Sequence, residues 1–289
     1  MTRPGAPSMA SASQDGQGSG RPLRELLLIG IGAGDPDWLT LEAVRAIQQL
    51  DVLFVVLKER DKDDLVDARR AVVSAHRPGP LRTVELRDPP RPWRTAPDYT
   101  EAVARWREER RTQWSEAVGW HLGAGETGGF LVWGDPGLYE STLAIVDELV
   151  AADDERAADA SPAAPHTVPP APLSRRVIPG ISSVHALTAR HGIPLNRQGR
   201  AVQVTPARLV ADGMPAGVDD VVVMLDGAQT FASIDPAGLD IYWGAYLGTK
   251  DELLISGDLA TVRDEILATR ADAAARKGWM FDTYLLRRR

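Results

Sequence analysis

The sequence predicts an α/β protein in which two α/β domains meet at a ligand-binding cleft. Short apolar runs typical of strands alternate with amphipathic helical segments along most of the 289 residues. Several of the early runs end in glycine-rich turns, which in a parallel sheet would all lie at the carboxyl edge, where ligands bind. A second series of strands and a helix follows after residue 195, which indicates a second sheet.

Composition excludes several classes of function. The chain has no cysteine, so disulfides and thiolate metal sites are excluded, and its 5 histidines show no zinc-ligand spacing. We therefore expect no metal. The net charge of −7 argues against nucleic-acid binding, and no apolar run approaches the roughly 18 residues of a membrane span. The absence of cysteine fits a reducing cytosol, so we expect a cytoplasmic protein with neither nucleic acid nor membrane as partner.

The first folded unit follows a polar tail. Residues 1–21 are rich in Gly, Ser and Pro and lack the apolar centre of a secretory signal, which predicts a disordered tail. Leu26–Ile29 reads as a strand and Gly30–Asp35 as a turn, and a helical segment then leads to a second strand at Asp51–Leu57. Strand, helix and strand in this order predict a parallel βαβ unit.

The helix of this unit has a recognisable start. Thr40 is a good N-cap residue, and the apolar spacing that follows predicts that Leu41, Val44 and Ile47 share the inward face. Residues 60–125 mix charged residues with widely spaced tryptophans, which favours amphipathic helix over much of this stretch.

The next unit carries a second glycine turn. Gly128–Pro136 reads as a strand that ends in a turn, and Ser141–Val150 reads as a helix. Residues 151–175 are dominated by Ala and Pro in their second half, and we expect a solvated loop or linker there. Because this segment interrupts ordered structure, it is treated as an insertion in the first domain.

Order resumes at residue 176. A short strand leads to Pro179–Gly180, and the following helix begins near Ser182 and stops at Gly192. We place the first domain at residues 22–195 and the second at 196–289. The second domain has strand-like runs in AVQVT, VVVML, IYWGAYLG and WMFDTYLL, and one clear helix at Val262–Thr269.

The first turn resembles a dinucleotide-binding loop but departs from it. The fingerprint GxGxxG needs a third glycine, and here Gly30 and Gly32 fit while Asp35 occupies the third position. A carboxylate would repel an approaching pyrophosphate, so a nicotinamide or flavin cofactor is disfavoured. A plain close-packed turn accounts for the two glycines but does not require Asp35.

The chemistry of the first turn recurs. Gly134–Ser141, GDPGLYES, again places Gly, Asp and Pro after a strand and before a helix, and residues 179–183, PGISS, form a third strand-terminal turn. A single turn of this kind is common. Their combination at one sheet edge indicates a ligand site.

With these motifs the sequence resembles the tetrapyrrole methylase family, whose members transfer methyl groups from S-adenosylmethionine. The segments that carry the resemblance are IGIGAGDPDWLTLEAVRAIQQLDVL, WGDPGLYES and VIPGISSVHALTARHGIPL. Their order and spacing agree with the family's signatures from Leu26 to Arg289, apart from the Ala/Pro-rich insertion. The resemblance implies a cofactor folded between two domains, S-adenosylhomocysteine as product, and a homodimer.

The resemblance also implies positions for the cofactor contacts. They fall in turns and at strand ends, at Ala33, Trp133, Gly134, Asp135, Leu138, Ser182, Ser183, Met224 and Gly248. Ala33 stands where many members have proline, and Trp133 where many have glycine. In this family the first turn lies near the substrate, so Gly32 and Gly34 are candidates for substrate binding.

Softer signals narrow the resemblance within the family. AYLGTKDE, WGDPGLYES and the YLLRRR terminus look most like the branch that methylates precorrin-5 at carbon 1 and releases acetate, in aerobic cobalamin biosynthesis. Uroporphyrinogen methylases carry an aspartate, a proposed base, where this chain has Val56. A uroporphyrinogen substrate is therefore disfavoured.

The implied reaction makes two chemical demands. Methyl transfer needs an electron-rich ring carbon held near the methyl group with water excluded. Release of acetate needs water at an acyl carbon and donors for the oxyanion. Candidates for the second task are Asp35, Tyr139, Glu140 and His185, each of which also has an ordinary structural interpretation. Spontaneous loss of the acetyl group is a further alternative.

A macrocyclic substrate with many carboxylates should be bound by arginine side chains. Arg87, Arg91 and Arg94 lie in the proline-stiffened segment RDPPRPWRT, with Trp93 placed to lie against a ring face. An ordinary solvated loop is the alternative for each arginine. Two other functions also stay open, namely a methyltransferase of this fold with another precorrin, diphthine or ribosomal RNA substrate, and a non-catalytic ligand-binding protein.

Overall fold

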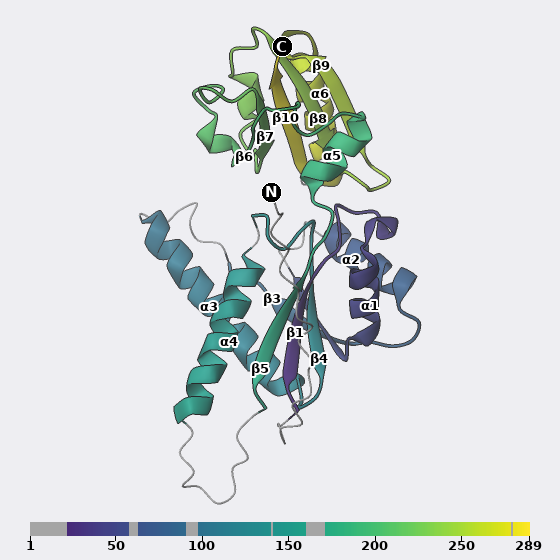
Figure 1. Cartoon of the computed structure of the whole chain (residues 1–289), viewed down its shortest axis with the longest axis vertical. Coiled ribbons are helices and arrows are strands. Elements are labelled where there is room, and N and C mark those ends of the chain that lie inside the picture. The colour runs from purple at the N-terminus through teal and green to yellow at the C-terminus, as the bar shows by residue number, and fades with distance from the viewer. Residues whose placement is uncertain (1–21, 58–62, 91–97, 140, 160–170, 279) are drawn as a thin grey trace, which may run out of the picture.

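The structure is a computed structural model that describes residues 22–57, 63–90, 98–139, 141–159, 171–278 and 280–289. Figure 1 shows two α/β domains stacked along the long axis of the molecule, each built on its own sheet. The strand order is β3-β2-β4-β1-β5 in the first sheet and β6-β7-β10-β8-β9 in the second. The prediction of two α/β domains is confirmed.

The first sheet is parallel throughout its described pairings. Its strands are β1 (Arg24–Gly30), β2 (Val52–Leu57), β3 (Arg82–Arg87), β4 (Thr127–Val132) and β5 (Leu173–Ile178). Its helices are α1 (Leu41–Gln49), α2 (Asp63–His76), α3 (Tyr99–His121) and α4 (Thr142–Asp159). Helices α1 and α2 cover one face and α3 and α4 the other (Figure 1). Alternate residues of β1 therefore enter two separate cores, and β1 is apolar on both faces.

Helix α1 starts as predicted, and its predicted inward face is right at Ile47 but wrong at Leu41. The Thr40 hydroxyl accepts a hydrogen bond from the Ala43 backbone N–H at 3.0 Å, which confirms the N-cap. Leu41, predicted to face inward, is 73% exposed. The buried residues of the helix are Ala43, Ala46 and Ile47. The prediction was wrong for Leu41 because the small alanines of the inward face carry little hydropathy and are easily outweighed by an exposed leucine.

The expected loop at residues 151–175 is partly regular structure. Helix α4 continues to Asp159, and β5 begins at Leu173, so only residues 160–170 of the predicted loop lie outside the described residues. The buried Asp153 carboxylate accepts from Arg24 Nη2 at 2.8 Å and from the Leu173 backbone N–H at 2.9 Å. Alanine and charged residues are good helix formers, and this buried ion pair joins the helix to the starts of β1 and β5.

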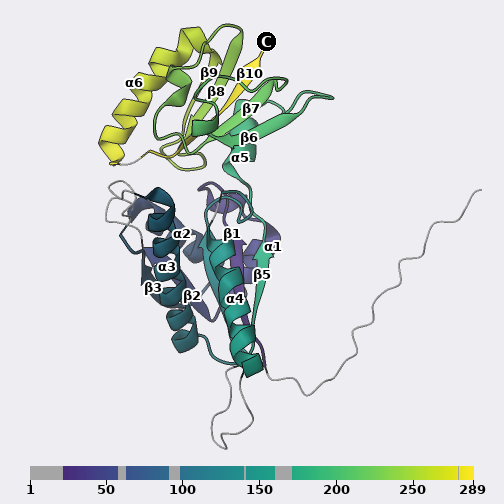
Figure 2. The same ribbon diagram turned by 90° about the vertical axis from the view of Figure 1, so that its left-hand side faces the viewer.

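The second sheet is mixed, with β6 parallel to β7 and the other described pairs antiparallel. Its strands are β6 (Val202–Pro206), β7 (Asp220–Met224), β8 (Leu239–Ala245), β9 (Leu253–Asp258) and β10 (Asp282–Arg288). Helix α6 (Leu259–Lys277) packs on one face and α5 (Ser183–His191) on the other (Figures 1 and 2). Strands β3 and β9 were not predicted. No helix of the described residues is apolar over a length that would cross a membrane.

Helix α5 belongs to a different domain from the one predicted. We expected it in the first domain, at residues 22–195, but its buried Val184 and Leu187 pack against Val222 and Leu285 of the second sheet. The chain therefore passes from one domain to the other at the PGISS turn. Sequence order alone places a helix after a strand, but the apolar face of the helix decides which sheet it covers.

Three glycine turns meet at the carboxyl edge of the first sheet. A Cβ on Gly30 would lie 2.5 Å from the Gly180 backbone N, and one on Gly180 would lie 2.2 Å from the Gly134 carbonyl oxygen. The Gly134 N–H donates to the Gly32 carbonyl at 2.8 Å, which joins the first and second turns. Gly30 and Gly180 are therefore required by backbone-to-backbone packing, whereas Gly134 is favoured by its positive φ of 71°.

This packing makes Gly180 sensitive to substitution. Gly180→Ala should destabilise the protein by about 3 kcal/mol, because backbone at 2.2 Å has to move to admit the methyl group. Gly119→Ala is a matched control, since its new Cβ meets nothing within 4 Å and the position lies in helix α3. The control should gain about 0.5–1 kcal/mol. Urea unfolding of both variants checks the two signs, and equal stability of Gly180→Ala and wild type would contradict the prediction.

Candidate active site between the domains

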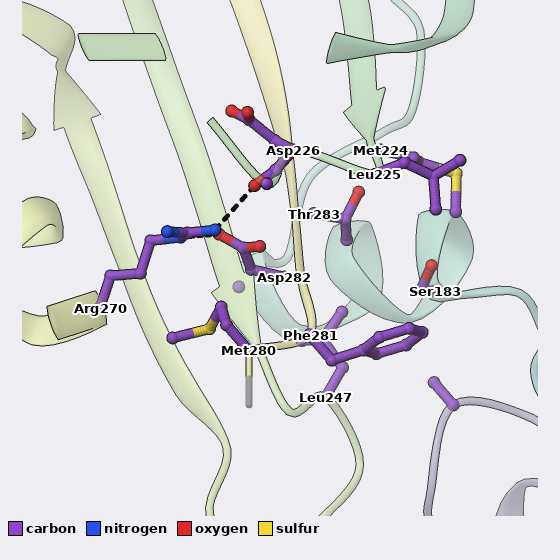
Figure 3. Close-up of a pocket in the computed structure, with 13 residues that line it drawn as sticks. Ser183, Met224, Leu225, Asp226, Leu247, Arg270, Met280, Phe281, Asp282 and Thr283 are labelled. Carbon is purple, nitrogen blue, oxygen red and sulfur yellow. Dashed lines mark hydrogen bonds and ion pairs between the residues drawn. The ribbon is translucent and has the colours of Figure 1, made fainter. Parts of the chain in front are cut away.

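A cavity of about 440 Å³ lies where the strand ends of the second sheet meet the first turn of the first domain. Apolar side chains make up much of its lining, including Met224, Leu247, Met280 and Phe281. Figure 3 shows Ser183 and Met224 on one side of the cavity and Arg270 and Met280 on the other. Mostly apolar cavities with a few polar groups are typical of cofactor sites.

The structure brings part of the predicted cofactor set together here. Ala33 of the first turn, Ser183 of α5 and Met224 of β7 all line the cavity. Gly248 directly follows Leu247, which also lines it. Residues from three separate segments thus converge on one cavity.

The remaining predicted cofactor residues gather at a smaller hollow of about 340 Å³ beside the second and third turns. Asp135, Leu138 and Ser182 line it, together with His185. Gly134 bridges to the first turn, and Trp133 precedes it at the end of β4. The predicted set is therefore divided between two adjacent parts of the domain boundary.

The Asp135 carboxylate holds two turns together. Its Oδ1 accepts from the Gly137 N–H at 2.8 Å, and its Oδ2 accepts from the Gly180 N–H at 3.0 Å. Both bonds go to backbone, so the carboxylate links the second turn to the third. These contacts give Asp135 a structural role at the meeting point of the two turns.

Two of the predicted catalytic residues lie near the small hollow. His185 Nδ1 lies 2.9 Å from the Ser182 hydroxyl, and both residues line the hollow. The Tyr139 hydroxyl donates to the Val204 carbonyl at 3.1 Å, and Val204 lines the same hollow from β6 of the second domain. Tyr139 adopts φ 51°, a left-handed conformation that costs energy for a bulky residue and places its ring across the domain boundary.

The other predicted catalytic and substrate residues are more scattered. Asp35 Oδ1 accepts from the Asp37 N–H at 2.9 Å and so caps the short 3₁₀ helix Pro36–Trp38. Gly32 and Gly34 both have positive φ, 73° and 149°, in the first turn. Arg87 is exposed at the end of β3. Glu140, Trp93, Arg91 and Arg94 lie outside the described residues.

Sequence reasoning missed a cluster that joins the domains. The Gly248 N–H donates to Glu252 Oε2 at 2.7 Å, and Arg190 Nε lies 3.0 Å from Glu252 Oε1. The Arg190 guanidinium in turn lies 4.6 Å from the centre of the Trp38 ring. A Cβ on Gly248 would meet the Asp35 backbone N at 3.0 Å, so the two loops are in direct contact. No sequence pattern marks these residues, because they are far apart in the chain.

Sequence reasoning also missed a polar group inside the cavity. Arg270 Nε donates to Asp282 Oδ2 at 2.9 Å, and Trp243 Nε1 donates to the same oxygen at 2.9 Å. Burial raises the pKa of the Asp282 carboxyl, against the opposing effect of Arg270. The only sequence signal is an aspartate within the otherwise apolar run WMFDTYLL.

The tetrapyrrole (corrin/porphyrin) methylase family model matches residues 25–263. The chain belongs to the tetrapyrrole methylase family. It is 40% identical over 268 residues to a precorrin-6A synthase [deacetylating] of Sinorhizobium sp., which covers 92% of this chain and 96% of the relative.

Solved structures of this family share the two-domain arrangement. A cobalamin synthesis related protein (CobF) from Corynebacterium diphtheriae is 30% identical, with a TM-score of 0.74 over 92% of this chain and 99% of that chain. A uroporphyrin-III C-methyltransferase from Thermus thermophilus, solved with S-adenosylhomocysteine, is 18% identical, with a TM-score of 0.54 over 91% of each chain. The second likeness supports the fold alone.

The two hydrogen bonds of the Asp135 carboxylate predict that its substitution destabilises the protein. Asp135→Asn leaves only one acceptor oxygen for the Gly137 and Gly180 N–H groups, and its amide faces one of these donors. We expect a loss of about 1–3 kcal/mol in the free energy of unfolding, measured by urea titration. Asp37→Asn, an exposed change in the neighbouring turn, is the control and should change stability by less than about 0.5 kcal/mol. Wild-type stability in Asp135→Asn would rule out this structural role.

Glu252 allows its two contacts to be separated by substitution. Glu252→Gln removes the charge that pairs with half-exposed Arg190 but keeps an acceptor for the Gly248 N–H, whereas Glu252→Ala removes both. We expect the alanine variant to bind S-adenosylhomocysteine about tenfold more weakly, and the glutamine variant to stay within about threefold of wild type. Titration calorimetry measures both. Equal losses in the two variants would show that the ion pair, rather than the hold on Gly248, matters.

Proposed function

We propose that this protein is a precorrin-6A synthase, which transfers a methyl group from S-adenosylmethionine to carbon 1 of precorrin-5 and releases acetate. The observation that carries the proposal is the 40% identity to the Sinorhizobium enzyme of that name over 92% of this chain and 96% of the relative. The departure at Val56, a half-buried residue of β2, supports a substrate other than uroporphyrinogen.

The cavity between the domains suits the adenosyl end of the cofactor. Its walls are apolar at Met224, Leu247 and Phe281, which matches a flat base, and its polar groups are confined to a few positions. Backbone at Gly248 approaches the first turn too closely for any side chain, so the cofactor would meet peptide groups there. When bound, S-adenosylmethionine supplies an electrophilic methyl group at its sulfonium.

The chain's own contribution to methyl transfer is positioning. The tightly packed turns at the carboxyl edge offer a rigid floor on which a flat macrocycle can lie, with Gly32 and Gly34 in the first turn. Rigid placement of the ring carbon and exclusion of water supply most of what such a transfer needs. Arg87, and Arg91 and Arg94 as predicted from sequence, would pair with substrate carboxylates.

A buried hydrogen-bond donor, the indole N–H of Trp133, lies at the boundary between the two domains. Trp133 is packed against the first core, and its ring meets Phe281 of the second domain edge-on, with centroids 6.1 Å apart. Its indole Nε1 is buried and has no hydrogen-bond partner among the described residues. A buried donor without a partner is costly, so we propose that an acceptor of the cofactor or substrate satisfies it.

Release of acetate requires water to add to the acyl carbon. The bond from that carbon to the ring then breaks and its electron pair stays with the ring, where methyl transfer can use it. We propose His185 as the base that takes the proton from water, since it lines the hollow and its Nδ1 lies 2.9 Å from the Ser182 hydroxyl, which orients the ring. Its Nε2 has no protein partner among the described residues. The Tyr139 hydroxyl donates to the Val204 carbonyl beside the same hollow, so it would have to exchange that bond to donate to the oxyanion.

Two further expectations from the sequence belong to this proposal. A homodimer is implied by the family resemblance, and we infer a cytoplasmic location because a chain without cysteine fits a reducing cytosol. Size-exclusion chromatography with light scattering tests the first expectation directly.

The decisive experiment is incubation with precorrin-5 and methyl-labelled S-adenosylmethionine, with mass analysis of the pigment and an assay for acetate. We expect one labelled methyl per macrocycle and one acetate. A labelled pigment without acetate would refute the deacetylating reaction but would still agree with a methyltransferase of this family. No binding of S-adenosylmethionine would favour a non-catalytic protein of this fold.

His185 gives a sharper variant of the same experiment. His185→Gln should lower the rate of acetate release about a hundredfold, because a general base contributes at least this factor, and should keep S-adenosylhomocysteine affinity within about threefold. His121→Gln, at the exposed end of α3, is the control and should retain the wild-type rate. Full acetate release by His185→Gln would point to another base or to spontaneous loss.

A further inference from the structure

The cavity contains one ion pair that its apolar lining does not explain. Arg270 on α6 and Asp282 at the start of β10 are paired at 2.9 Å, with side chains only 9% and 4% exposed. Figure 3 shows the two groups next to each other at the side of the cavity away from Ser183. Burying an ion pair of this kind costs about as much as it returns, so it is weak support for stability. A role toward a ligand is the alternative.

The hydrogen bonds that hold the Arg270–Asp282 pair leave one polar atom of each side chain without a partner among the described residues. Asp282 Oδ2 accepts from both Trp243 Nε1 and Arg270 Nε, and Arg270 Nη2 donates to the Asp226 carbonyl at 2.7 Å. No hydrogen bond among the described residues engages Asp282 Oδ1 or Arg270 Nη1. Neither atom is fully enclosed without a partner, and both residues line the cavity. The pair therefore keeps one acceptor and one donor atom without a protein partner among the described residues, in two side chains that line the cavity.

This arrangement matches one edge of adenine. A carboxylate oxygen only accepts hydrogen bonds, and a guanidinium only donates them. The base edge of adenine offers the reverse pair, an exocyclic amino donor beside the ring acceptor N1. In the proposed function the sulfur end of the cofactor faces the substrate at the first turn near Ala33, so the base would lie at the opposite side of the cavity, where Arg270 and Met280 stand (Figure 3).

We propose that Asp282 and Arg270 determine the specificity for adenine, with Asp282 Oδ1 accepting from the exocyclic amino group and Arg270 Nη1 donating to N1. The inference rests on the proposed function, because the nucleoside is that of S-adenosylmethionine. Trp243 and the Asp226 carbonyl are positioning groups in this arrangement, since their hydrogen bonds fix the orientation of Asp282 and Arg270.

The test compares two ligands that differ at this edge alone. S-inosyl-L-homocysteine replaces the amino donor by a carbonyl and the N1 acceptor by N–H, so both contacts become repulsive. Wild-type protein should bind S-adenosyl-L-homocysteine about a hundredfold more tightly than the inosyl ligand, as measured by titration calorimetry. In Asp282→Asn, whose amide can donate to the carbonyl, this ratio should fall below about tenfold.

A matched control separates recognition from folding. Asp220 is also a buried carboxylate of the second sheet, paired with Arg287 at 2.6 Å, and it does not line the cavity. Asp220→Asn should lower the urea midpoint and leave the ratio of the two affinities unchanged. The wild-type ratio needs no variant, so the test stands even where Asp282→Asn folds poorly.

Three results would overturn the proposal. One is a wild-type ratio below about tenfold, and another is a ratio that Asp282→Asn leaves unchanged. In the third, Asp282→Asn discriminates less between S-adenosylhomocysteine and its 2′-deoxy analogue but keeps the wild-type ratio between S-adenosylhomocysteine and the inosyl ligand. That result would assign the carboxylate to the ribose. Failure of wild type to bind S-adenosylhomocysteine at all would instead refute the proposed function.

Discussion

The close approach of three glycine turns at the carboxyl edge of the first sheet is the constraint on which the rest of the structure depends. At Gly30 and Gly180 the backbones of the three turns approach within distances that no side chain would allow, and the Gly134 carbonyl is the nearest neighbour of Gly180. Asp135 then fastens two of these turns through backbone N–H groups. Because β4, β1 and β5 are neighbours in a parallel sheet, this packing sets where the chain leaves the first domain and enters the second.

The second domain is positioned from that edge. The PGISS turn leads directly into α5, which covers the second sheet, and the first turn reaches the β8–β9 loop at Gly248. Arg190 and Glu252 hold this loop against Trp38. The cavity is lined by Ala33 from one domain and by strand ends from the other, so it exists only where both domains are in place. A ligand bound there is enclosed by the same contacts that orient the domains.

The second-domain side of the cavity, at Asp226, is made rigid by buried polar groups. The Asp226 carboxylate accepts from the Thr230 N–H, the Thr230 hydroxyl and the Tyr284 hydroxyl. Burial and the nearby Asp226 charge raise the pKa of Tyr284 far above its usual value, so the phenol stays protonated and continues to donate. Fully bonded networks of this kind fix side chains in one arrangement. A rigid cavity wall suits a site that positions two reactants, because positioning errors of a fraction of an ångström reduce the rate of methyl transfer.

Much of this protein could be predicted from local sequence alone. The strand–turn–helix order, the Thr40 cap and the three turns are each contained in a few consecutive residues, and together they predict the two-domain α/β fold and the family. Tertiary structure decided which sheet α5 covers, how far α4 extends, and that Leu41 faces solvent. It also decided the pairing of Arg190 with Glu252 and of Arg270 with Asp282. The physical reason is range: turns and caps are formed by neighbours in the chain, whereas a domain boundary and a buried ion pair depend on packing between segments that the sequence separates.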